Sequence, residues 1–113
     1  MGKWYHGTSE RNMKLILQSW FRPKKGVWGK GVYFSSSKDG ASIFGSCILA
    51  TQIVDERIIP VDYEEWVSRH PDRSTWPKEI QKLGGKGISV HYHHSNETEL
   101  CVFDPSIINQ IFY

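Results

Sequence analysis

Three short segments of the chain carry residue types that could do chemistry together. The first is Tyr5-His6-Gly7-Thr8, in which a histidine directly precedes a glycine. The second runs from 29 to 35 (Gly-Lys-Gly-Val-Tyr-Phe-Ser), and the third from 99 to 105 (Glu-Leu-Cys-Val-Phe-Asp-Pro). Glu99 lies at the start of an otherwise apolar strand. Burial of an acid in such a place costs solvation free energy unless the acid has a partner or a functional role. Each segment alone also has an ordinary explanation, such as a surface histidine, an exposed strand end or a glycine turn.

Local patterns predict the elements that would position these segments. Residues 3–6 are aromatic and precede Gly7 and Thr8, which is typical of a strand that ends in a turn. Ser9 suits the N-cap of a helix over 10–19, where apolar residues recur at spacings of three and four. A glycine-rich turn at 29–31 then leads into the next strand.

The rest of the chain mixes strands and helices without regular alternation. The further strands are expected over 32–35, 48–54, 57–61, 87–92, 98–103 and 107–113, and the further helices over 38–45 and 76–83. The helix over 38–45 should carry Ala41, Ile43 and Phe44 on one side. Residues 62–75 are polar and are expected to be irregular. This pattern predicts an α+β fold.

Length and composition favour one globular domain over residues 1–113. The chain has 113 residues, of which 39% are hydrophobic and 23% charged, close to globular averages. No apolar run approaches the roughly 18 residues that cross a bilayer, and the N-terminus lacks a secretory signal pattern. We therefore expect a cytoplasmic monomer with no membrane partner. In that reducing compartment Cys47 and Cys101 are expected to be buried thiols in neighbouring strands.

Charge is distributed unevenly along the chain. Residues 11–38 hold seven basic residues and no acid, whereas the remainder holds seven basic and twelve acidic residues. A basic block of this kind suggests a face for anions, and phosphates of a nucleotide or nucleic acid are the natural partners. A solvated basic face without a partner is the alternative.

The run His91-Tyr92-His93-His94 is the one histidine cluster. His91 and His93 would lie on one strand face and could form a two-ligand metal edge, but no third ligand is visible in the sequence. We therefore expect surface histidines and no metal site. The chain also lacks a P-loop, a dinucleotide-binding Rossmann fingerprint and a serine-nucleophile elbow.

Taken in order, the three segments resemble motifs of the ADP-ribosyltransferase superfamily, in the branch related to poly(ADP-ribose) polymerase catalytic domains. That branch has a His-Gly-Thr segment at the end of its first strand, matched at 6–8. A Gly-x-Gly-[Ile/Val]-Tyr-Phe-[Ala/Ser] strand follows, matched at 29–35, and an acid opens a strand that ends in Phe-Asp-Pro, matched at 99–105. The resemblance spans the chain from His6 onward and implies a minimal catalytic domain with a split, antiparallel or mixed β-sheet.

The resemblance also implies roles for individual residues, with NAD as substrate. His6, Tyr33 and Glu99 would form the catalytic triad: His6 would bind the adenosine-side ribose, Tyr33 would stack on the nicotinamide, and Glu99 would bind the nicotinamide ribose. Phe44 would complete an aromatic clamp, and the backbone of Gly7 would approach the carboxamide. The other residues expected at the NAD site are Thr8, Lys30, Gly31, Ser35 and Ser42.

Two positions depart from the family pattern. The family often carries a serine eight residues after the tyrosine, but Ala41 stands there, with Ser42 beside it. Glu97 lies two residues before Glu99 and would share its strand face, so it is a second possible active-site acid. The Phe-Asp-Pro register favours Glu99.

The function that follows from the resemblance is NAD-dependent mono-ADP-ribosyl transfer to a macromolecular acceptor, either protein or nucleic acid. Cleavage of the nicotinamide glycosidic bond passes through an oxocarbenium-like state, which a nearby carboxylate stabilises. Two alternatives stay open. One is an NAD glycohydrolase with water as acceptor, and the other is a catalytically idle module that binds a nucleotide or nucleic acid.

Overall fold

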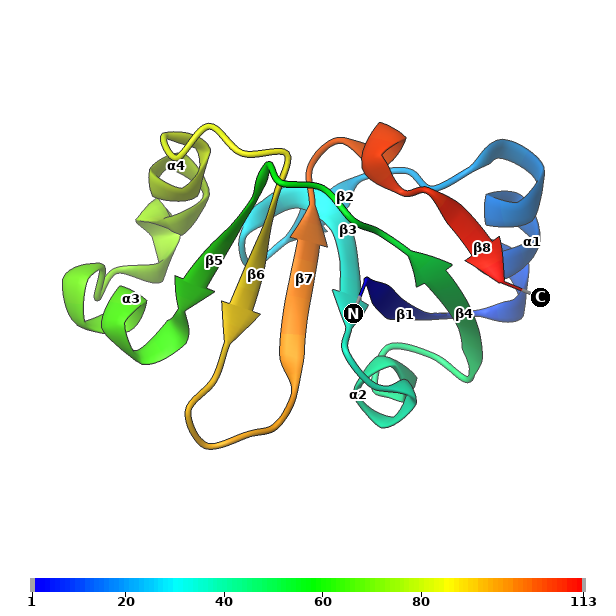
Figure 1. Cartoon of the computed structure of the whole chain (residues 1–113), viewed down its shortest axis with the longest axis horizontal. Helices are drawn as coiled ribbons and strands as arrows, with labels where there is room; N and C mark the ends of the chain where they lie inside the picture. The colour runs from blue at the N-terminus through cyan, green and yellow to red at the C-terminus, as the bar shows by residue number, and fades with distance from the viewer. Residues whose placement is uncertain (1, 113) are drawn as a thin grey trace.

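One mixed sheet of eight strands organises the chain in the computed structural model, which describes residues 2–112 (Figure 1). The strands are β1 (Lys3–Thr8), β2 (Lys24–Gly26), β3 (Gly29–Ser35), β4 (Cys47–Gln52), β5 (Ile58–Asp62), β6 (Gly87–His91), β7 (Thr98–Val102) and β8 (Gln110–Phe112). Their order is β5-β6-β7-β3-β1-β4-β8, with β2 paired to β3. Only β5 and β6 run parallel among the described pairs. The α+β class is confirmed.

Four short α-helices flank this sheet. They are α1 (Glu10–Ser19), α2 (Lys38–Ser42), α3 (Tyr63–Arg69) and α4 (Trp76–Gln81), joined by 3₁₀ turns at Arg73–Thr75 and Pro105–Ile107. In Figure 1, α3 and α4 lie at one end of the molecule beside β5, and α1 lies at the other end. Among the described residues, no helix combines the length and hydropathy that a bilayer crossing requires.

The first helix forms where the sequence predicts it. The hydroxyl of Ser9 accepts a hydrogen bond from the backbone N–H of Asn12 at 3.1 Å, which satisfies one free donor of the first turn. Glu10 adds a negative charge next to the positive end of the helix dipole. Ile16 is the buried anchor of the helix.

The sheet is nearly divided between β1 and β3. These two strands pair at one register position, Tyr5 opposite Ser35, whereas β1 and β4 pair at six. Beyond that position the two strands diverge, so the backbone there is free to border a cavity.

Two hydrophobic cores lie on opposite faces of the sheet, because side chains alternate along each strand. In β7, Leu100 and Val102 belong to one core, whereas Cys101 belongs to the other. The first core includes Ile16, Phe21, Val32, Phe34, Leu49 and Ile107. The second core is built around Trp28, Trp66, Trp76, Ile80, Ile88 and Val90.

The prediction of an irregular segment over 62–75 is wrong. The carboxylate of Asp62 caps α3 by accepting a hydrogen bond from the backbone N–H of Glu65 at 3.1 Å. Trp66 is the buried anchor of this helix. Its other residues are polar or partly exposed, so the segment lacks the repeating apolar face that identified the first helix.

Three other expectations need correction. The helix over 38–45 ends at Ser42, so Ala41 is buried while Ile43 and Phe44 are 80% and 64% exposed. The two cysteines are not in neighbouring strands, because β3 and β1 separate their strands β7 and β4. The strand predicted over 107–113 is β8, preceded by a 3₁₀ turn, and Tyr113 lies outside the described residues.

Candidate functional site

A pocket of about 310 Å³ opens where β1 and β3 diverge. Its walls come from the end of β1, from α1 and the segment after it, from β3 and from the turn after α2. The lining residues are His6, Gly7, Thr8, Asn12, Leu15, Ile16, Ser19, Trp20, Phe21, Arg22, Lys24, Gly31, Val32, Tyr33 and Phe44. A mostly apolar wall with a few polar groups is typical of small-molecule sites.

His6 presents one defined nitrogen to this pocket. Its Nδ1 lies 2.7 Å from the carbonyl oxygen of Tyr33. A carbonyl oxygen only accepts hydrogen bonds, so Nδ1 carries the hydrogen and Nε2 is left as an acceptor. Burial lowers the pKa of His6, with a smaller effect in the same direction from the positive charge of Lys24. The ring is therefore neutral at neutral pH.

Tyr33 is fixed by hydrogen bonds at its far end. Its hydroxyl donates to the carbonyl of Gly29 at 2.8 Å and accepts from the backbone N–H of Trp28 at 3.0 Å. The ring lies so close to Gly26 that a Cβ on that glycine would stand 2.5 Å from the ring. Burial raises the pKa of the phenol, so it stays protonated.

Aromatic side chains form the mouth of the pocket. Phe44 belongs to its lining although most of its surface faces solvent, so this ring is not part of either core. Trp20 directly follows α1 and packs edge-on against Phe21, with ring centroids 5.4 Å apart. Its backbone φ of 78° lies in the left-handed region, which is uncommon for a bulky residue. The indole N–H of Trp20 donates to the carbonyl of Pro105 at 3.2 Å, which helps to hold this conformation.

Two cations, Arg22 and Lys24, line the pocket. Lys30, the lysine expected there, does not line it. Lys30 pairs with Lys25 across the β2–β3 hairpin, and its side chain is exposed.

Glu99 does not line the pocket, but it lies on the strand next to Tyr33. Tyr33 is opposite Cys101, and Ser35 is opposite Glu99, in the pairing of β3 with β7. Directly opposed residues point to the same face of a sheet, so Tyr33 and Glu99 share a face. Oε1 of Glu99 accepts hydrogen bonds from Nε1 of Trp28 at 2.8 Å and from the hydroxyl of Tyr92 at 3.3 Å.

Glu97 has a different environment. Oε2 of Glu97 accepts a hydrogen bond from the Ser35 hydroxyl at 2.7 Å, and Oε1 accepts one from Ser37. These hydroxyls lower the pKa of the carboxyl. Both oxygens of Glu97, on the loop just before β7, are thus engaged with the end of β3 and the N-cap of α2. Ser35, expected at the NAD site, is directed to Glu97 instead.

The small residues of the expected site are placed by packing. A Cβ on Gly7 would lie 1.7 Å from the carbonyl oxygen of Ala41, so the glycine allows β1 to contact the end of α2. A Cβ on Gly31 would lie 2.5 Å from the sulfur of Cys101. Thr8 is buried and lines the pocket. Ser42 does not line it, and its hydroxyl donates to the carbonyl of Asp39 at 2.7 Å.

No protein-family model and no curated protein matches this chain. The chemistry of the pocket and of its neighbouring carboxylates is therefore the basis for a functional proposal.

Several lining residues were absent from the predicted site. Asn12, Leu15 and Ser19 lie three and four positions apart on one face of α1, and this spacing was a usable signal. Trp20 and Arg22 follow directly in the chain. Arg22 belongs to the basic block over 11–38, so its charge was a second signal.

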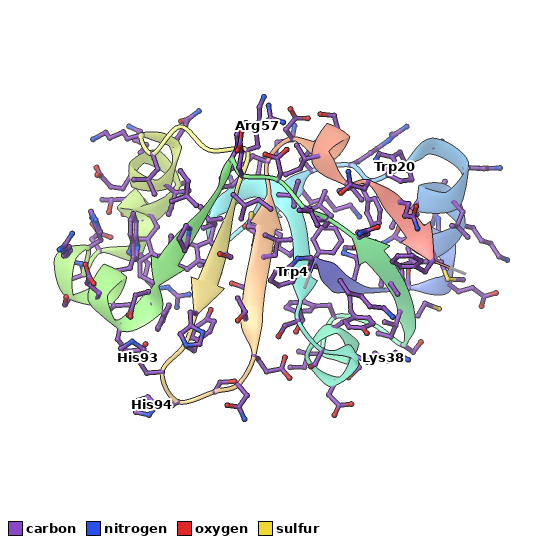
Figure 2. The ribbon with its side chains drawn as sticks, viewed as in Figure 1. Trp4, Trp20, Lys38, Arg57, His93 and His94 are labelled. Atoms are coloured by element: carbon purple, nitrogen blue, oxygen red, sulfur yellow. The ribbon has the colours of Figure 1, made fainter. Side chains whose placement is uncertain are left out.

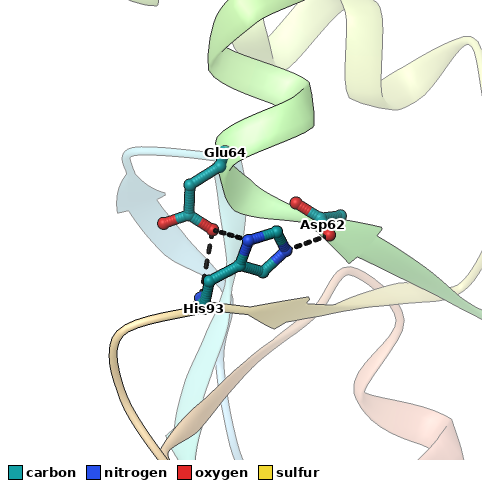
Figure 3. A group of neighbouring side chains, drawn as sticks. All are labelled: Asp62, Glu64 and His93. Atoms are coloured by element: carbon teal, nitrogen blue, oxygen red, sulfur yellow. Dashed lines mark hydrogen bonds and ion pairs between the residues drawn. The ribbon is translucent and has the colours of Figure 1, made fainter.

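The histidine cluster lies away from this pocket, at the far end of β6. His93 and His94 are on the loop between β6 and β7 (Figure 2). Figure 3 shows His93 between two carboxylates: Nε2 lies 2.5 Å from Oδ2 of Asp62, and Nδ1 lies 3.7 Å from Oε1 of Glu64. Each ring nitrogen faces a different carboxylate. This is the geometry of an ion-paired histidine that ties the loop to β5 and α3.

Proposed function

We propose that the protein is an NAD-dependent ADP-ribosyltransferase that cleaves the nicotinamide glycosidic bond and transfers ADP-ribose to a macromolecule. The observation that carries the proposal is the convergence of His6, Tyr33 and Phe44 on one pocket at the division of the sheet. The resemblance implies a role in NAD binding for each of them: His6 and Tyr33 belong to the matched motifs, and Phe44 follows the second motif in the chain.

The pocket's chemistry fits the parts of a dinucleotide. The aromatic side chains offer stacking surfaces to a flat ring, a contact worth about 0.5–1.5 kcal/mol beyond area burial. Nε2 of His6 is an acceptor suited to a ribose hydroxyl. Arg22 and Lys24 supply positive charge for a pyrophosphate.

The reaction needs a carboxylate near the bond that breaks. The bond between C1′ of the ribose and the ring nitrogen of nicotinamide breaks, and its electron pair leaves with nicotinamide, which becomes neutral. Positive charge develops on the ribose, and an anionic group fixed nearby lowers the barrier. The nucleophile of the acceptor then forms a bond to C1′ and releases its proton to a base or to water.

The structure favours Glu99 over Glu97 for this role. Both oxygens of Glu97 accept hydrogen bonds from serine hydroxyls. Trp28 and Tyr92 both donate to Oε1 of Glu99. Among the described residues 2–112 nothing donates to Oε2, so this oxygen is available to a substrate hydroxyl.

The test is incubation of the purified protein with NAD labelled in its adenine half, with and without a cell lysate. Release of nicotinamide together with label in protein or nucleic acid supports the proposal, and Glu99→Gln should lower the rate of both about 10²–10³-fold. Label found only as free ADP-ribose would make the protein a glycohydrolase. Binding of NAD without nicotinamide release would make it an idle binding module, and absence of both would overturn the proposal.

A further inference from the structure

The indole of Trp28 is buried next to Glu99, although the two residues are 71 positions apart in the chain. Its side chain is 1% exposed, and its Nε1–H donates to Oε1 of Glu99 at 2.8 Å. A hydrogen bond to a carboxylate is shorter and stronger than one between two neutral groups. This contact is therefore a strong constraint on the position of the carboxylate.

Trp28 itself is held rigidly. Its ring stacks on Trp76 with centroids 4.8 Å apart and an angle of 13° between the planes, and it meets Trp66 edge-on at 6.0 Å. Its backbone N–H donates to the hydroxyl of Tyr33 at 3.0 Å. One residue thus contacts both Tyr33, which lines the pocket, and Glu99, on the neighbouring strand.

The two oxygens of Glu99 are not equivalent. Oε1 accepts from Trp28 and, at 3.3 Å, from the hydroxyl of Tyr92. An indole N–H can only donate a hydrogen bond. It therefore holds one oxygen of the carboxylate in place and cannot itself accept a hydrogen bond from a substrate hydroxyl. Oε2 has no hydrogen-bond partner in the part of the chain that the structure describes.

We propose that Trp28 is a positioning residue for the carboxylate of Glu99, with a weaker contribution from Tyr92. Together they hold Oε1 and orient Oε2 towards the ribose hydroxyl of the substrate. This inference rests on the proposed function, because it gives Trp28 a part in the same reaction. Transition-state stabilisation depends on groups that are already oriented before the reaction begins, so loss of the indole N–H should reduce turnover rather than substrate binding.

The kinetic test compares Trp28→Phe with Trp66→Phe. Trp66 belongs to the same core, but its buried Nε1 has no hydrogen-bond partner among the described residues. Both variants lose the same atoms, so Trp66→Phe controls for the loss of ring volume. Nicotinamide release should show a kcat about ten- to a hundredfold lower in Trp28→Phe, with little change in KM for NAD. Tyr92→Phe should lower kcat severalfold, and Trp66→Phe should leave it near wild type.

Three kinetic outcomes would overturn the inference. They are an unchanged kcat in Trp28→Phe, a change confined to KM, and an equal loss of kcat in Trp66→Phe. If Trp28→Phe does not fold, Tyr92→Phe carries the kinetic test, and an unchanged kcat there would count against the inference.

A second measurement does not need activity. In a ¹⁵N–¹H spectrum, the indole N–H signal of Trp28 should shift in Glu99→Ala, and its exchange with solvent should accelerate. The indole signal of Trp76, which donates to the carbonyl of His70 at 2.7 Å, serves as the control and should stay in place. An unmoved Trp28 signal would overturn the inference even in an active enzyme. Absence of nicotinamide release by the wild-type protein would instead overturn the proposed function.

Discussion

The imidazole of His6 and the backbone carbonyl of Tyr33 are joined by a hydrogen bond of 2.7 Å that spans the point where β1 and β3 diverge. The bond fixes the ring at the edge of the pocket and determines which of its nitrogens can accept. Burial lowers the pKa of His6, so the acceptor form is present at neutral pH. Protonation would convert Nε2 from an acceptor into a donor.

The first prediction concerns binding at this nitrogen. ADP-ribose should bind His6→Phe more weakly than wild type, because the phenyl ring can keep the contacts with Phe21 and Phe34 but offers no acceptor. Wild-type affinity should also fall on acidification through the lowered pKa of His6. Calorimetric titration with ADP-ribose over a pH series measures both effects. An affinity of His6→Phe equal to that of wild type at neutral pH would remove His6 from the site.

The same group makes stability depend on pH. In the unfolded chain a histidine has a pKa near 6.5, and in the folded protein the pKa of His6 is lower. The folded state therefore binds fewer protons, and the free energy of unfolding falls as the pH drops from 6.5 towards the lowered value. Denaturant unfolding should show a smaller loss over this range in His6→Phe than in wild type.

His93 has the opposite dependence. Asp62, and with a smaller effect Glu64, raise the pKa of His93 above 6.5. The stabilisation is thus complete below 6.5 and is lost as the pH rises through the raised value. The pKa of Asp62 is itself lowered, mainly by the helix-capping hydrogen bond from Glu65 and then by His93. Acidification through this lowered pKa protonates Asp62 and so weakens its ion pair with His93.

We therefore expect His93→Gln to lower the melting temperature at mildly acidic pH and to have little effect at alkaline pH. Because the pair is exposed, the difference should be small and should shrink with added salt. His94→Gln on the same loop is the control. A difference that stays constant across pH would mean that His93 acts through packing and not through charge.

Local sequence patterns predict the elements whose signals are local. Ser9, Glu10 and the apolar spacing after them identify α1, and the glycine turn before Val32 identifies β3. The segment that forms α3 has one apolar anchor, Trp66, among polar neighbours, so periodicity could not reveal it.

Local sequence patterns are also limited in what they reveal of the candidate site. His6 and Tyr33, which two of the motifs single out, both line one pocket, because β1 and β3 border the divided part of the sheet. The hydrogen bond from Trp28 to Glu99 joins two positions far apart in the chain, so no local pattern encodes it. Likewise, Ser35 matches the motif by type, yet tertiary packing directs its hydroxyl to Glu97.

The two acids provide a further prediction. Glu99→Gln should lower the rate of nicotinamide release about 10²–10³-fold with little change in NAD affinity, as expected for loss of one preorganised charge. Glu97→Gln should reduce turnover only mildly, because both Glu97 oxygens already serve Ser35 and Ser37. Single-turnover kinetics with an NAD-binding assay separate the two steps. A larger loss in Glu97→Gln would mean that the third motif is displaced by two residues.

Phe44 should contribute to ligand stacking and not to the core. Phe44→Ala should stay folded, since 64% of the side chain is exposed, and should bind nicotinamide-like inhibitors about two- to tenfold more weakly. Ile43→Ala removes a neighbouring side chain that is 80% exposed and does not line the pocket, so its affinity should match wild type. Equal affinities in the two variants would place the stacking surface elsewhere.

The lysines of the basic block should separate into two groups. Lys24 lines the pocket, whereas Lys25 and Lys30 lie opposite each other on the outer hairpin. Lys24→Ser should therefore weaken NAD binding, and the pair of substitutions at Lys25 and Lys30 should leave it intact. If a nucleic acid is the acceptor, the two substitutions at Lys25 and Lys30 should weaken the binding of oligonucleotides. The logarithm of wild-type affinity should then fall with the logarithm of salt concentration with a slope of about 0.7–0.9 per phosphate contacted. Electrophoretic shift of single- and double-stranded DNA and RNA across a salt series measures this slope, with Lys78→Ser on α4 as the control. Transfer to protein in lysate without oligonucleotide binding would exclude nucleic acid as the acceptor and leave the hairpin lysines with a solvating role.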